Sequence, residues 1–433
     1  MADDASEMDV EVKSESESDD EEEKEMNDDA EKNEEKEIYL PGKKFAEDET
    51  LVYDPTAYYM YHRAATGAPC LSFDIIPDKL GEQRDEFPLT CYVAAGTQAS
   101  KGKPNFLLVM KLQNLTEEEK QDDDESDDES DDDDPPELDI IPIPHAGAVN
   151  RIRVTVVNDV SLAATWAETG TVYIYDFSAE LNMVDDQNEV TNYVSTKNSV
   201  IQAFSGHQTE GFALDWSPTV KGRLASGDCD GFIHVLEPRE SQWDISKAPY
   251  TGHTGSVEDI QWSPNEDSVF ASCSTDHTIR AWDVRAKPSS ACMLTVSEAH
   301  THDVNVIHWN RKEPFIASGG DDGVIKIWDL RLLKDKKPVV VFGHHLQPIT
   351  SIEWNPNDSS VFAASGADDQ ITIWDLAVEP EEGASDDLPI PPQLLFIHQG
   401  QSDIKELHWH PQLPGVIIST AQSDFNIFRA ISV

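Results

Sequence analysis

Short apolar stretches of strand length, separated by polar turns, fill most of the chain after residue 68. The clearest unit is residues 252–283, GHTGSVEDIQWSPNEDSVFASCSTDHTIRAWD. It holds an apolar run from Val257 to Pro264, a short apolar segment from Val269 to Ser272, and an alternating run from Thr278 to Trp282 that follows a turn containing Asp276. Apolar runs of this length with alternating polarity predict β-strands. The unit therefore predicts three short strands joined by turns.

The same unit recurs along the chain at a nearly constant interval. A Trp-Asp pair closes it at Trp282, Trp328 and Trp374, which are 46 residues apart. The tryptophan at the end of the first strand recurs at positions 216, 262, 309, 354 and 409, in steps of 46, 47, 45 and 55. Self-similarity at this period, with Gly-His at the start and Trp-Asp at the end, is typical of a WD-repeat β-propeller. We expect an all-β fold.

Counting units gives seven blades between residues 68 and 433. Blades four, five and six carry the full pattern, and the other four are degenerate. Strand candidates of the first blade are Leu71 to Pro77, Leu89 to Thr97, Phe106 to Leu112 and, as its outer strand, Asp139 to Ile143. The markers of blades two, three and seven are His145 with Tyr175-Asp176, Gly206-His207 with Leu236-Glu237, and His398 with Trp409 and Phe428-Arg429.

The seventh blade lacks an outer strand, because the chain ends four residues after Arg429. A closed ring removes open sheet edges, which otherwise invite aggregation. The N-terminal region must therefore supply the missing strand. The candidates are Ile38 to Leu40 and the segment just before a predicted helix.

That helix is predicted over Asp54 to Gly67, DPTAYYMYHRAATG, within an N-terminal anchor and helix at residues 38–67. Asp54 suits the N-cap, Pro55 the first helical position and Gly67 the stop. Tyr58, Tyr61 and Ala65 would then lie on one face at helical spacing. We expect this amphipathic helix to lie against the side of the propeller.

The repeat residues also predict buried hydrogen-bonded networks, since buried polar groups need partners. Each network is expected to join a histidine, a serine, a turn aspartate and the tryptophan. The sets are His253, Ser272, Asp276 and Trp282; His300, Ser318, Asp322 and Trp328; and His344, Asp368 and Trp374, where Ala364 stands at the serine position beside Ser365. A catalytic set would not repeat, so we interpret these sets as scaffold.

The net charge of −52 is concentrated in two segments. Residues 1–37 carry 19 acidic and 4 basic side chains, and residues 117–137 carry 15 acidic side chains and Lys120. The first predicts a disordered acidic tail and the second a disordered loop inserted in blade one. With no basic patch evident, specific nucleic-acid binding is not expected, and the expected partner is itself basic. A purely solubilising role is the plainer alternative.

Serines among these acids are candidate phosphorylation sites, where phosphate would deepen the negative charge. They are Ser14, Ser16, Ser18, Ser126 and Ser130.

Several chemistries find no support in the sequence. The five cysteines are odd in number and lack C-x-x-C spacing, which argues against a disulfide framework and against a zinc site. This usage fits a reducing compartment. The sequence contains no apolar leader that would predict secretion. It also contains no run of eighteen apolar residues that would predict a membrane span. Neither a Gly-rich phosphate loop nor a nucleophile motif is present. His408 and His410 flank Trp409 on a strand, and we expect them to pack in the core or at the rim. We therefore expect a monomeric, non-catalytic propeller without cofactor or metal.

A further loop, at residues 378–392, reads acidic and then Pro391-Pro392 before an apolar strand. With the predicted helix, it resembles the histone-binding WD-repeat subfamily of chromatin-assembly and retinoblastoma-associated proteins. That resemblance implies a groove between helix and loop for a basic partner helix. The residues expected to line it are Tyr58, Tyr61, His62, Glu379, Glu381, Glu382, Asp386, Asp387, Pro391 and Pro392.

The acidic N-terminus, the acidic insertion and the YLPG phrase at Tyr39 to Gly42 together resemble the glutamate-rich ribosome-assembly WD-repeat family over essentially the whole chain. The resemblance implies a nuclear and nucleolar assembly factor of the large ribosomal subunit. It also implies a dedicated chaperone for a new basic ribosomal protein, the one called L-three. Histone binding in chromatin assembly is the alternative with the same groove.

A rival hypothesis comes from the Trp-Asp-x-Arg pattern in two adjacent blades. It resembles the box of substrate receptors of cullin-RING ubiquitin ligases, which bind an adaptor. The matching residues are Asp276, Asp283 and Arg285, and Asp322, Asp329 and Arg331. Such arginines also occur in propellers without this role, where they can pair with an acid of a neighbouring blade.

Overall fold

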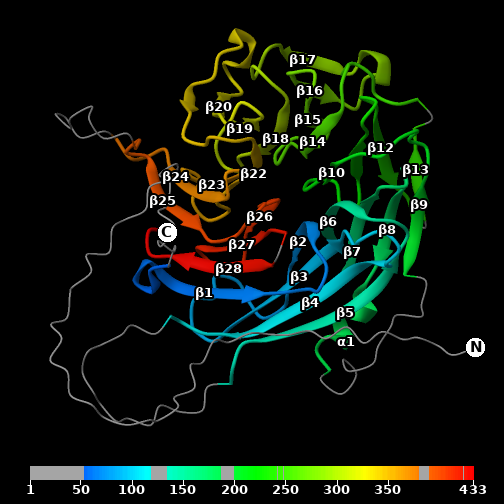
Figure 1. Cartoon of the computed structure of the whole chain (residues 1–433). Helices are drawn as coiled ribbons and strands as arrows, with labels where there is room; N and C mark the ends of the chain where they lie inside the picture. The colour runs from blue at the N-terminus through cyan, green and yellow to red at the C-terminus, as the bar shows by residue number, and fades with distance from the viewer. Residues whose placement is uncertain are drawn as a thin grey trace, which may run out of the picture.

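The computed structural model describes residues 53–118, 134–186, 199–240, 242–246, 248–379, 390–422 and 424–433. Seven antiparallel sheets, each of four strands, stand side by side around a ring (Figure 1). The chain is therefore a seven-bladed β-propeller, as the repeat predicts. Among the described residues the helices are short: η1 (Pro55–Ala57), α1 (Ser178–Met183), η3 (Pro288–Ser290) and η4 (Leu333–Asp335).

In the first six blades, four consecutive strands pair in chain order from the centre of the ring outward. Blade one contains β2 (Cys70–Ile76), β3 (Leu89–Thr97), β4 (Asn105–Leu115) and β5 (Glu137–His145). Blade two contains β6 (Val149–Val157), β7 (Val160–Ala167), β8 (Val172–Asp176) and β9 (Val200–Phe204). Blade three contains β10 (Ala213–Trp216), β11 (Leu224–Gly227), β12 (Ile233–Pro238) and β13 (Trp243–Ile245).

The next three blades follow the same plan. Blade four contains β14 (Val257–Trp262), β15 (Val269–Ser274), β16 (Ile279–Asp283) and β17 (Cys292–Val296). Blade five contains β18 (Val304–Trp309), β19 (Phe315–Gly320), β20 (Ile325–Asp329) and β21 (Val340–Phe342). Blade six contains β22 (Ile349–Trp354), β23 (Val361–Gly366), β24 (Gln370–Asp375) and β25 (Leu394–Gln399).

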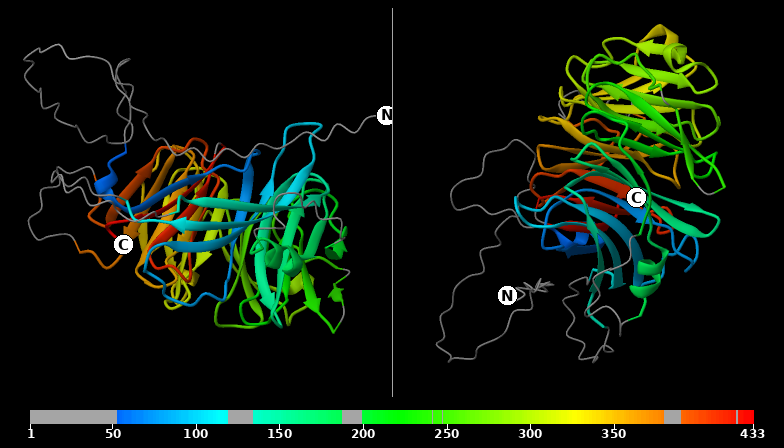
Figure 2. Two further views of the ribbon diagram at one scale, coloured as in Figure 1. Left: turned by 90° about the horizontal axis from the view of Figure 1, so that it is seen from below. Right: turned by 90° about the vertical axis from the view of Figure 1, so that its right-hand side faces the viewer.

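Blade seven combines the two ends of the described chain. It contains β26 (Glu406–Trp409), β27 (Val416–Thr420) and β28 (Phe425–Ala430), and its outer strand is β1 (Tyr58–Ala64), which pairs antiparallel with β28. Figure 1 shows β1 alongside β28, and Figure 2 shows the same pair from two other sides. The ring is thus closed by an N-terminal strand, as its open edge requires.

The helix predicted over Asp54 to Gly67 is wrong. Asp54 does accept a hydrogen bond from the Thr56 amide at 3.0 Å, but the turn that it begins is only the 3₁₀ helix η1. From Tyr58 the buried positions are Tyr58, Met60 and Ala64, which fits a strand better than the expected helical face. The unpaired edge of β28 supplies the hydrogen bonds that favour the strand.

Three domain boundaries change with this strand. The propeller includes Tyr58–Ala64, so it does not begin at residue 68. The closing strand is this segment itself, not the residues that precede Asp54. The other closing candidate, residues 38–40, lies outside the described residues. The predicted loop 117–137 loses its ends, because the Glu118 amide donates to the Tyr59 carbonyl at 2.9 Å and Glu137 begins β5.

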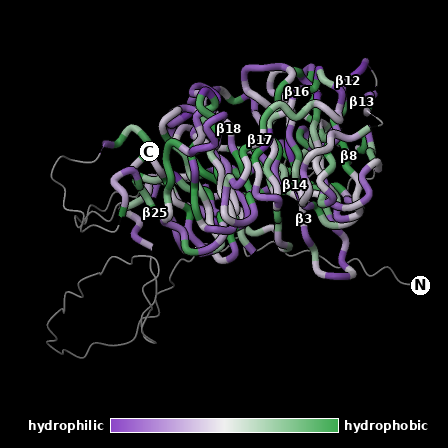
Figure 3. The backbone as a smooth tube through the Cα atoms, turned by 90° about the horizontal axis from the view of Figure 1, so that it is seen from above, coloured by the Kyte–Doolittle hydropathy of each residue, from purple (hydrophilic) through white to green (hydrophobic). Residues whose placement is uncertain are grey.

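The hydrophobic core is divided among the seven interfaces between neighbouring blades. One buried cluster fills each interface; Trp354 and Trp374, for example, pack with Ile327 between blades five and six. The last cluster joins Met60 of blade seven to Phe73 of blade one. Because neighbouring blades cover both faces, second strands such as β15 and β23 are buried along their whole length. Figure 3 shows hydrophobic colour along the strands and hydrophilic colour on many of the connecting loops.

The predicted histidine networks are confirmed in blades four and five. The Trp282 indole donates to Ser272 Oγ at 2.8 Å, and Ser272 Oγ lies 2.7 Å from His253 Nε2. His253 Nδ1 donates to Asp276 at 3.0 Å, so the carboxylate fixes the tautomer that accepts from the serine. The second set has the same geometry, with Trp328 on Ser318 at 2.8 Å and His300 on Asp322 at 2.9 Å.

The third network differs from the prediction in two members. Its histidine is His345, not His344, and it bonds Asp368 at 2.9 Å. Its hydroxyl comes from Thr372, which bonds His345 Nε2 at 2.9 Å and accepts from the Trp374 indole at 2.7 Å. Thr372 lies directly opposite Ala364 in the register of β23 and β24, so the neighbouring strand replaces the missing serine.

Blade seven departs from its predicted start in the same way. His398 belongs to β25 of blade six, where its ring stacks on Phe428 with centroids 4.0 Å apart. The network position of blade seven is taken by Gln401, which accepts from Ser419 at 2.6 Å and donates to the Asp424 carbonyl at 3.1 Å.

Candidate protein-binding site

Three tyrosines lead from the core to the surface where the N-terminal strand meets blade six. Tyr58 is buried, Tyr61 is half-buried and Tyr53 is 47% exposed. The Tyr53 ring lies 5.0 Å from that of Tyr61, and the Tyr58 ring lies 5.4 Å from it. Phe396 of β25 completes the group, 5.3 Å from Tyr58. We call these four residues the tyrosine platform.

Its buried end is held by His398, whose Nδ1 shares a hydrogen bond of 2.8 Å with the Tyr58 hydroxyl. Burial lowers the pKa of His398 to about 3, so the imidazole stays neutral. Burial likewise raises the pKa of Tyr61 to about 12. Near neutral pH the platform is therefore an uncharged aromatic surface.

Stability should depend on pH through His398. Its pKa in the folded protein lies below the ordinary value of about 6.5, so the unfolded chain binds the proton first as pH falls. Lowering pH from 7 to 5 should cost about 2 kcal/mol for this histidine. In urea unfolding at both pH values, His398→Gln should reduce the pH 7 to pH 5 difference by about that amount. An unchanged difference would show that His398 is protonated in the folded protein.

Acidic side chains lie beside β1 and before β25, the two strands that carry most of the platform. Glu117 and Glu118 follow β4, and the Glu118 amide donates to Tyr59 on β1 at 2.9 Å. Glu137 begins β5, and Glu379 is exposed after β24. The Gln393 side-chain amide donates to the Val378 carbonyl at 3.0 Å, which places Glu379 near the Pro391-Pro392 segment. An aromatic surface edged by carboxylates suits an amphipathic basic segment.

Of the residues predicted to line the groove, the structure describes Tyr58, Tyr61, His62, Glu379, Pro391 and Pro392. Tyr58 is a core residue, while Tyr61 is half-buried and His62 bonds the Thr116 carbonyl at 3.0 Å. Pro391 is half-buried and Pro392 exposed, just before β25. Outside the described residues lie Glu381, Glu382, Asp386 and Asp387, and the serines Ser14, Ser16, Ser18, Ser126 and Ser130.

Two contributors, Tyr53 and Phe396, escape sequence reasoning. Tyr53 precedes the residue expected to cap a helix, and Phe396 lies in an apolar strand without a marker of its own. The charge pattern assigns Glu117 and Glu118 only to a loop.

The Trp-Asp-x-Arg residues have local partners. Arg285 forms a two-pronged ion pair with Asp283 of its own blade, with a shortest distance of 2.6 Å, and Arg331 pairs with Asp329 at 2.7 Å. Among the described residues, neither arginine pairs with an acid of a neighbouring blade, which was the alternative interpretation. Both guanidinium groups remain mostly exposed, whereas Asp276 and Asp322 are held inside the histidine networks.

At the centre of the ring, side chains link each inner strand to the next. Six blades offer an acceptor to a backbone amide of the following blade, and Arg151 of blade two donates to the Phe212 carbonyl at 2.8 Å. The acceptors and amides are Asp74 and Val154, Asp215 and Trp262, Asp259 and Ile307, His308 and Trp354, Glu353 and Trp409, and Glu406 and Phe73. These links run through all seven interfaces.

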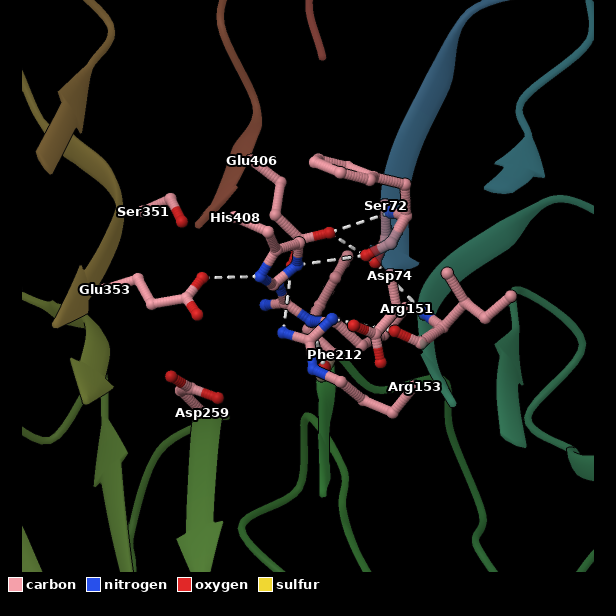
Figure 4. A network of polar contacts seen from close by, with 12 residues as sticks. Ser72, Asp74, Arg151, Arg153, Phe212, Asp259, Ser351, Glu353, Glu406 and His408 are labelled. Carbon is pink, nitrogen blue, oxygen red and sulfur yellow. Dashed lines mark hydrogen bonds and ion pairs between the residues drawn. The ribbon is translucent and has the colours of Figure 1, made fainter. Parts of the chain in front are cut away.

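Glu406 is the most connected member of this ring (Figure 4). Its Oε1 lies 2.8 Å from both Arg151 and Arg153 of blade two, and its Oε2 accepts from Ser72 at 2.6 Å. The carboxylate is fully buried, which raises its pKa, but the two arginines outweigh burial and hold that pKa well below its usual range. Glu406 thus joins blades seven, one and two as a charged group.

His408 extends the same cluster toward blade six. Its Nδ1 lies 2.7 Å from Glu353 and its Nε2 donates to the Phe73 carbonyl at 3.0 Å. Burial lowers its pKa, but the carboxylates of Glu353 and Glu406 outweigh burial and raise it to about 10. His410 lies beyond the strand and accepts amides of Gln412 and Leu413 at 3.1 Å. Both histidines have structural partners.

The described residues offer no group of three or more His, Cys, Asp or Glu side chains placed to hold a metal ion. The five cysteines, all described, are free thiols. Within the described part of the chain no helix has the length and apolarity needed to cross a bilayer.

Comparison with known proteins relates the chain to two families. Residues 48–116 match the family of the histone-binding protein RBBP4, whose description also covers a component of the CAF1 complex. Residues 246–283, 291–329 and 336–375 match the WD domain, G-beta repeat. The first match contains the whole of β1 and reaches the end of β4, which are the elements beside the tyrosine platform.

Curated relatives align along nearly the whole chain. "Protein HEAT STRESS TOLERANT DWD 1" of Arabidopsis thaliana is 42% identical over 92% of this chain and 92% of its own. "Ribosome assembly protein rrb1" of Schizosaccharomyces pombe is 41% identical over 99% of this chain and 92% of its own. "Glutamate-rich WD repeat-containing protein 1" of Dictyostelium discoideum is 44% identical over 93% of this chain and 86% of its own.

Proposed function

Because this chain belongs to the family of glutamate-rich WD-repeat proteins that includes the ribosome assembly protein of Schizosaccharomyces pombe, we propose that it is a non-catalytic binding protein of ribosome biogenesis. Its client is a basic large-subunit ribosomal protein of the L-three type. The protein holds this client in the nucleus and nucleolus until rRNA takes it over. The tyrosine platform and its surrounding carboxylates carry the proposal.

The chemistry of such a client explains the two parts of the site. Free ribosomal proteins are strongly basic and bind unintended polyanions, so a carrier must cover positive charge reversibly. Exposed carboxylate–ammonium pairs contribute only about 0.2–1 kcal/mol each, and salt screens them. The aromatic rings of Tyr53 and Tyr61 must therefore supply much of the affinity, as aromatic anchors do at protein interfaces. Charge then provides fast association and easy release to rRNA.

Co-expression with the candidate ribosomal protein tests this function. The client should be soluble with this chain and aggregate without it. In fluorescence anisotropy, Tyr53→Ala should weaken binding about tenfold, as loss of an aromatic anchor does. Replacing Glu117, Glu118 and Glu379 together by Gln should weaken it by a similar factor at low salt and by less at high salt. A client that is equally insoluble with and without this chain contradicts the proposal.

Two alternatives use surfaces described above, and the same assay separates them. The match to the histone-binding family over residues 48–116 supports a histone client at the same platform. Competition between a histone H4 helix and the ribosomal protein ranks the two.

The Arabidopsis relative's name contains DWD, and the exposed Arg285 and Arg331 would fit a ubiquitin-ligase adaptor. Changing both arginines to Gln should remove adaptor binding without weakening client binding.

A further inference from the structure

One edge of blade five is basic, although the chain as a whole carries a net charge of −52. Six exposed cations lie in the turn between β18 and β19 and in the connection between β20 and β21: Arg311, Lys312, Arg331, Lys334, Lys336 and Lys337. The Leu330 amide donates to the Pro314 carbonyl at 2.9 Å, which joins the two loops. Glu313 and Asp335 are the acidic residues of these two loops, and Asp329, the last residue of β20, is already paired with Arg331. We call the six cations the basic rim.

Apolar side chains border the basic rim. Leu332 and Val339 are about half exposed in the same connection, at 49% and 47%, and Val341 on β21 is 55% exposed. The connection is anchored by Leu333, which is buried against blade four, and by Lys336, which donates to Ser297 at 3.4 Å. A fixed surface that combines lysines with exposed aliphatic groups suits a ligand that alternates acidic and apolar residues.

The chain itself contains such a ligand. Residues 7–12 read Glu-Met-Asp-Val-Glu-Val, so carboxylates alternate with Met8, Val10 and Val12. By contrast, the acidic run 119–134 contains no apolar residue and residues 380–389 contain few, namely Ala384, Leu388 and two prolines. Among the three acidic segments, the N-terminal one alone matches both components of the basic rim.

The topology places the point where the N-terminal segment joins the propeller on the same edge of the ring as the basic rim. In every blade the first and third strands run in the same direction, so the first-to-second and third-to-fourth connections leave from the same edge. β1 is a fourth strand, and its first residue therefore lies at the edge that carries the basic rim, two blades away. Forty residues separate Val12 from Tyr53, and an extended chain of that length spans over 100 Å.

We propose that the N-terminal acidic segment, residues 1–37, binds the basic rim of its own molecule when no client is bound, with residues 7–12 as its anchor. Linkage gives the segment an effective concentration on the order of 1 mM, so weak contacts suffice. Occupation of the rim withholds acidic groups from a basic client and keeps the lysines from binding other polyanions. The docking itself does not depend on the proposed function. Only the competition with a client rests on that function.

Zero-length carbodiimide cross-linking of the full chain, followed by mass spectrometry, tests the docking without any client. Lys334, Lys336 and Lys337 should link to carboxylates of residues 1–37 at 50 mM salt and lose those links at 1 M salt. Lys101 and Lys103, exposed in the turn between β3 and β4 at the opposite edge, are the internal control. Replacing Met8, Val10 and Val12 by Ser should at least halve the rim links.

Three cross-linking outcomes would overturn the proposal. Links from the rim lysines to residues 119–134 in place of residues 1–37 would show that another acidic segment binds the rim. Links that join two isotopically distinct molecules would show a second copy as the occupant. Equal labelling of the rim and of Lys101 and Lys103 would show no docking at all.

Competition is measured with a fluorescent oligolysine of fifteen residues. Changing Lys334, Lys336 and Lys337 to Gln should tighten oligolysine binding about three- to tenfold at 50 mM salt, because the tail is released. The same change in a chain lacking residues 1–37 should have a much smaller effect, which separates release of the tail from the change in net charge. Equal effects in both backgrounds contradict the competition. Rim cross-links without any binding of the ribosomal protein would instead count against the proposed function alone.

Discussion

Replacing Glu406 by Gln should destabilise the propeller by about 3–5 kcal/mol, the usual cost of removing one member of a buried ion cluster. Arg151 and Arg153 would lose the carboxylate that lies 2.8 Å from each, and Ser72 would lose an acceptor. Two guanidinium groups would then remain at the centre of the ring without their hydrogen-bonded carboxylate, with Asp74 and Asp259 as the remaining nearby acids.

Thermal unfolding checks this result. The melting temperature of Glu406→Gln should fall by at least about 5 °C. Glu240→Gln, which changes an exposed glutamate in the same way, should shift it by less than about 1 °C. If the two variants melt together, the links between the inner strands do not hold blades seven, one and two together.

The second large effect is expected at the closing strand. Tyr58→Ala should cost about 3–5 kcal/mol, because it removes a buried aromatic ring from the interface of blades six and seven. The change also removes the hydrogen bond to His398. Tyr59→Ala is a matched control on the same strand, since Tyr59 is exposed and touches only the Arg429 guanidinium among its ring contacts.

Chemical unfolding of the two alanine variants, with Tyr58→Phe as a third, separates packing from hydrogen bonding. Tyr58→Phe keeps the ring and should cost only about 1 kcal/mol. Equal stability of Tyr58→Ala and Tyr59→Ala would mean that β1 contributes little to closing the ring.

The repeat made most of the fold predictable. First-strand tryptophans recur in blades three to seven, and Trp-Asp pairs in blades four to six, because these blades bury the same positions against their neighbours. Their period, together with the apolar alternation of blades one and two, gives the blade count. The degenerate first blade is also predictable, since its strands retain apolar alternation without Gly-His or Trp-Asp. Local spacing even contained the correct histidine of blade six: His345 stands 23 residues before Asp368, as His253 does before Asp276.

The errors arose where a distant partner decides the local structure. Residues 54–67 carry a helix cap, a proline at the first position and a terminal glycine, yet Tyr58–Ala64 is a strand because β28 offers an open edge. Thr372 could not be recognised as the hydroxyl of its network, since it lies on the strand opposite the expected position. The aromatic members of the candidate site follow the same rule: Tyr53 and Phe396 each contact Tyr58, so they join one cluster only once β1 is in place.

The pairing of β1 with β28 also sets the order in which this protein can be completed. A ribosome makes β1 first and β28 last among the strands, and domains acquire structure as they emerge. Until β28 leaves the ribosomal exit tunnel, β1 has no partner in its sheet and one interface of the ring stays open. A translation product truncated before residue 425 would therefore lack the edge that β1 needs, so premature termination should yield an open, aggregation-prone chain even when six blades are intact.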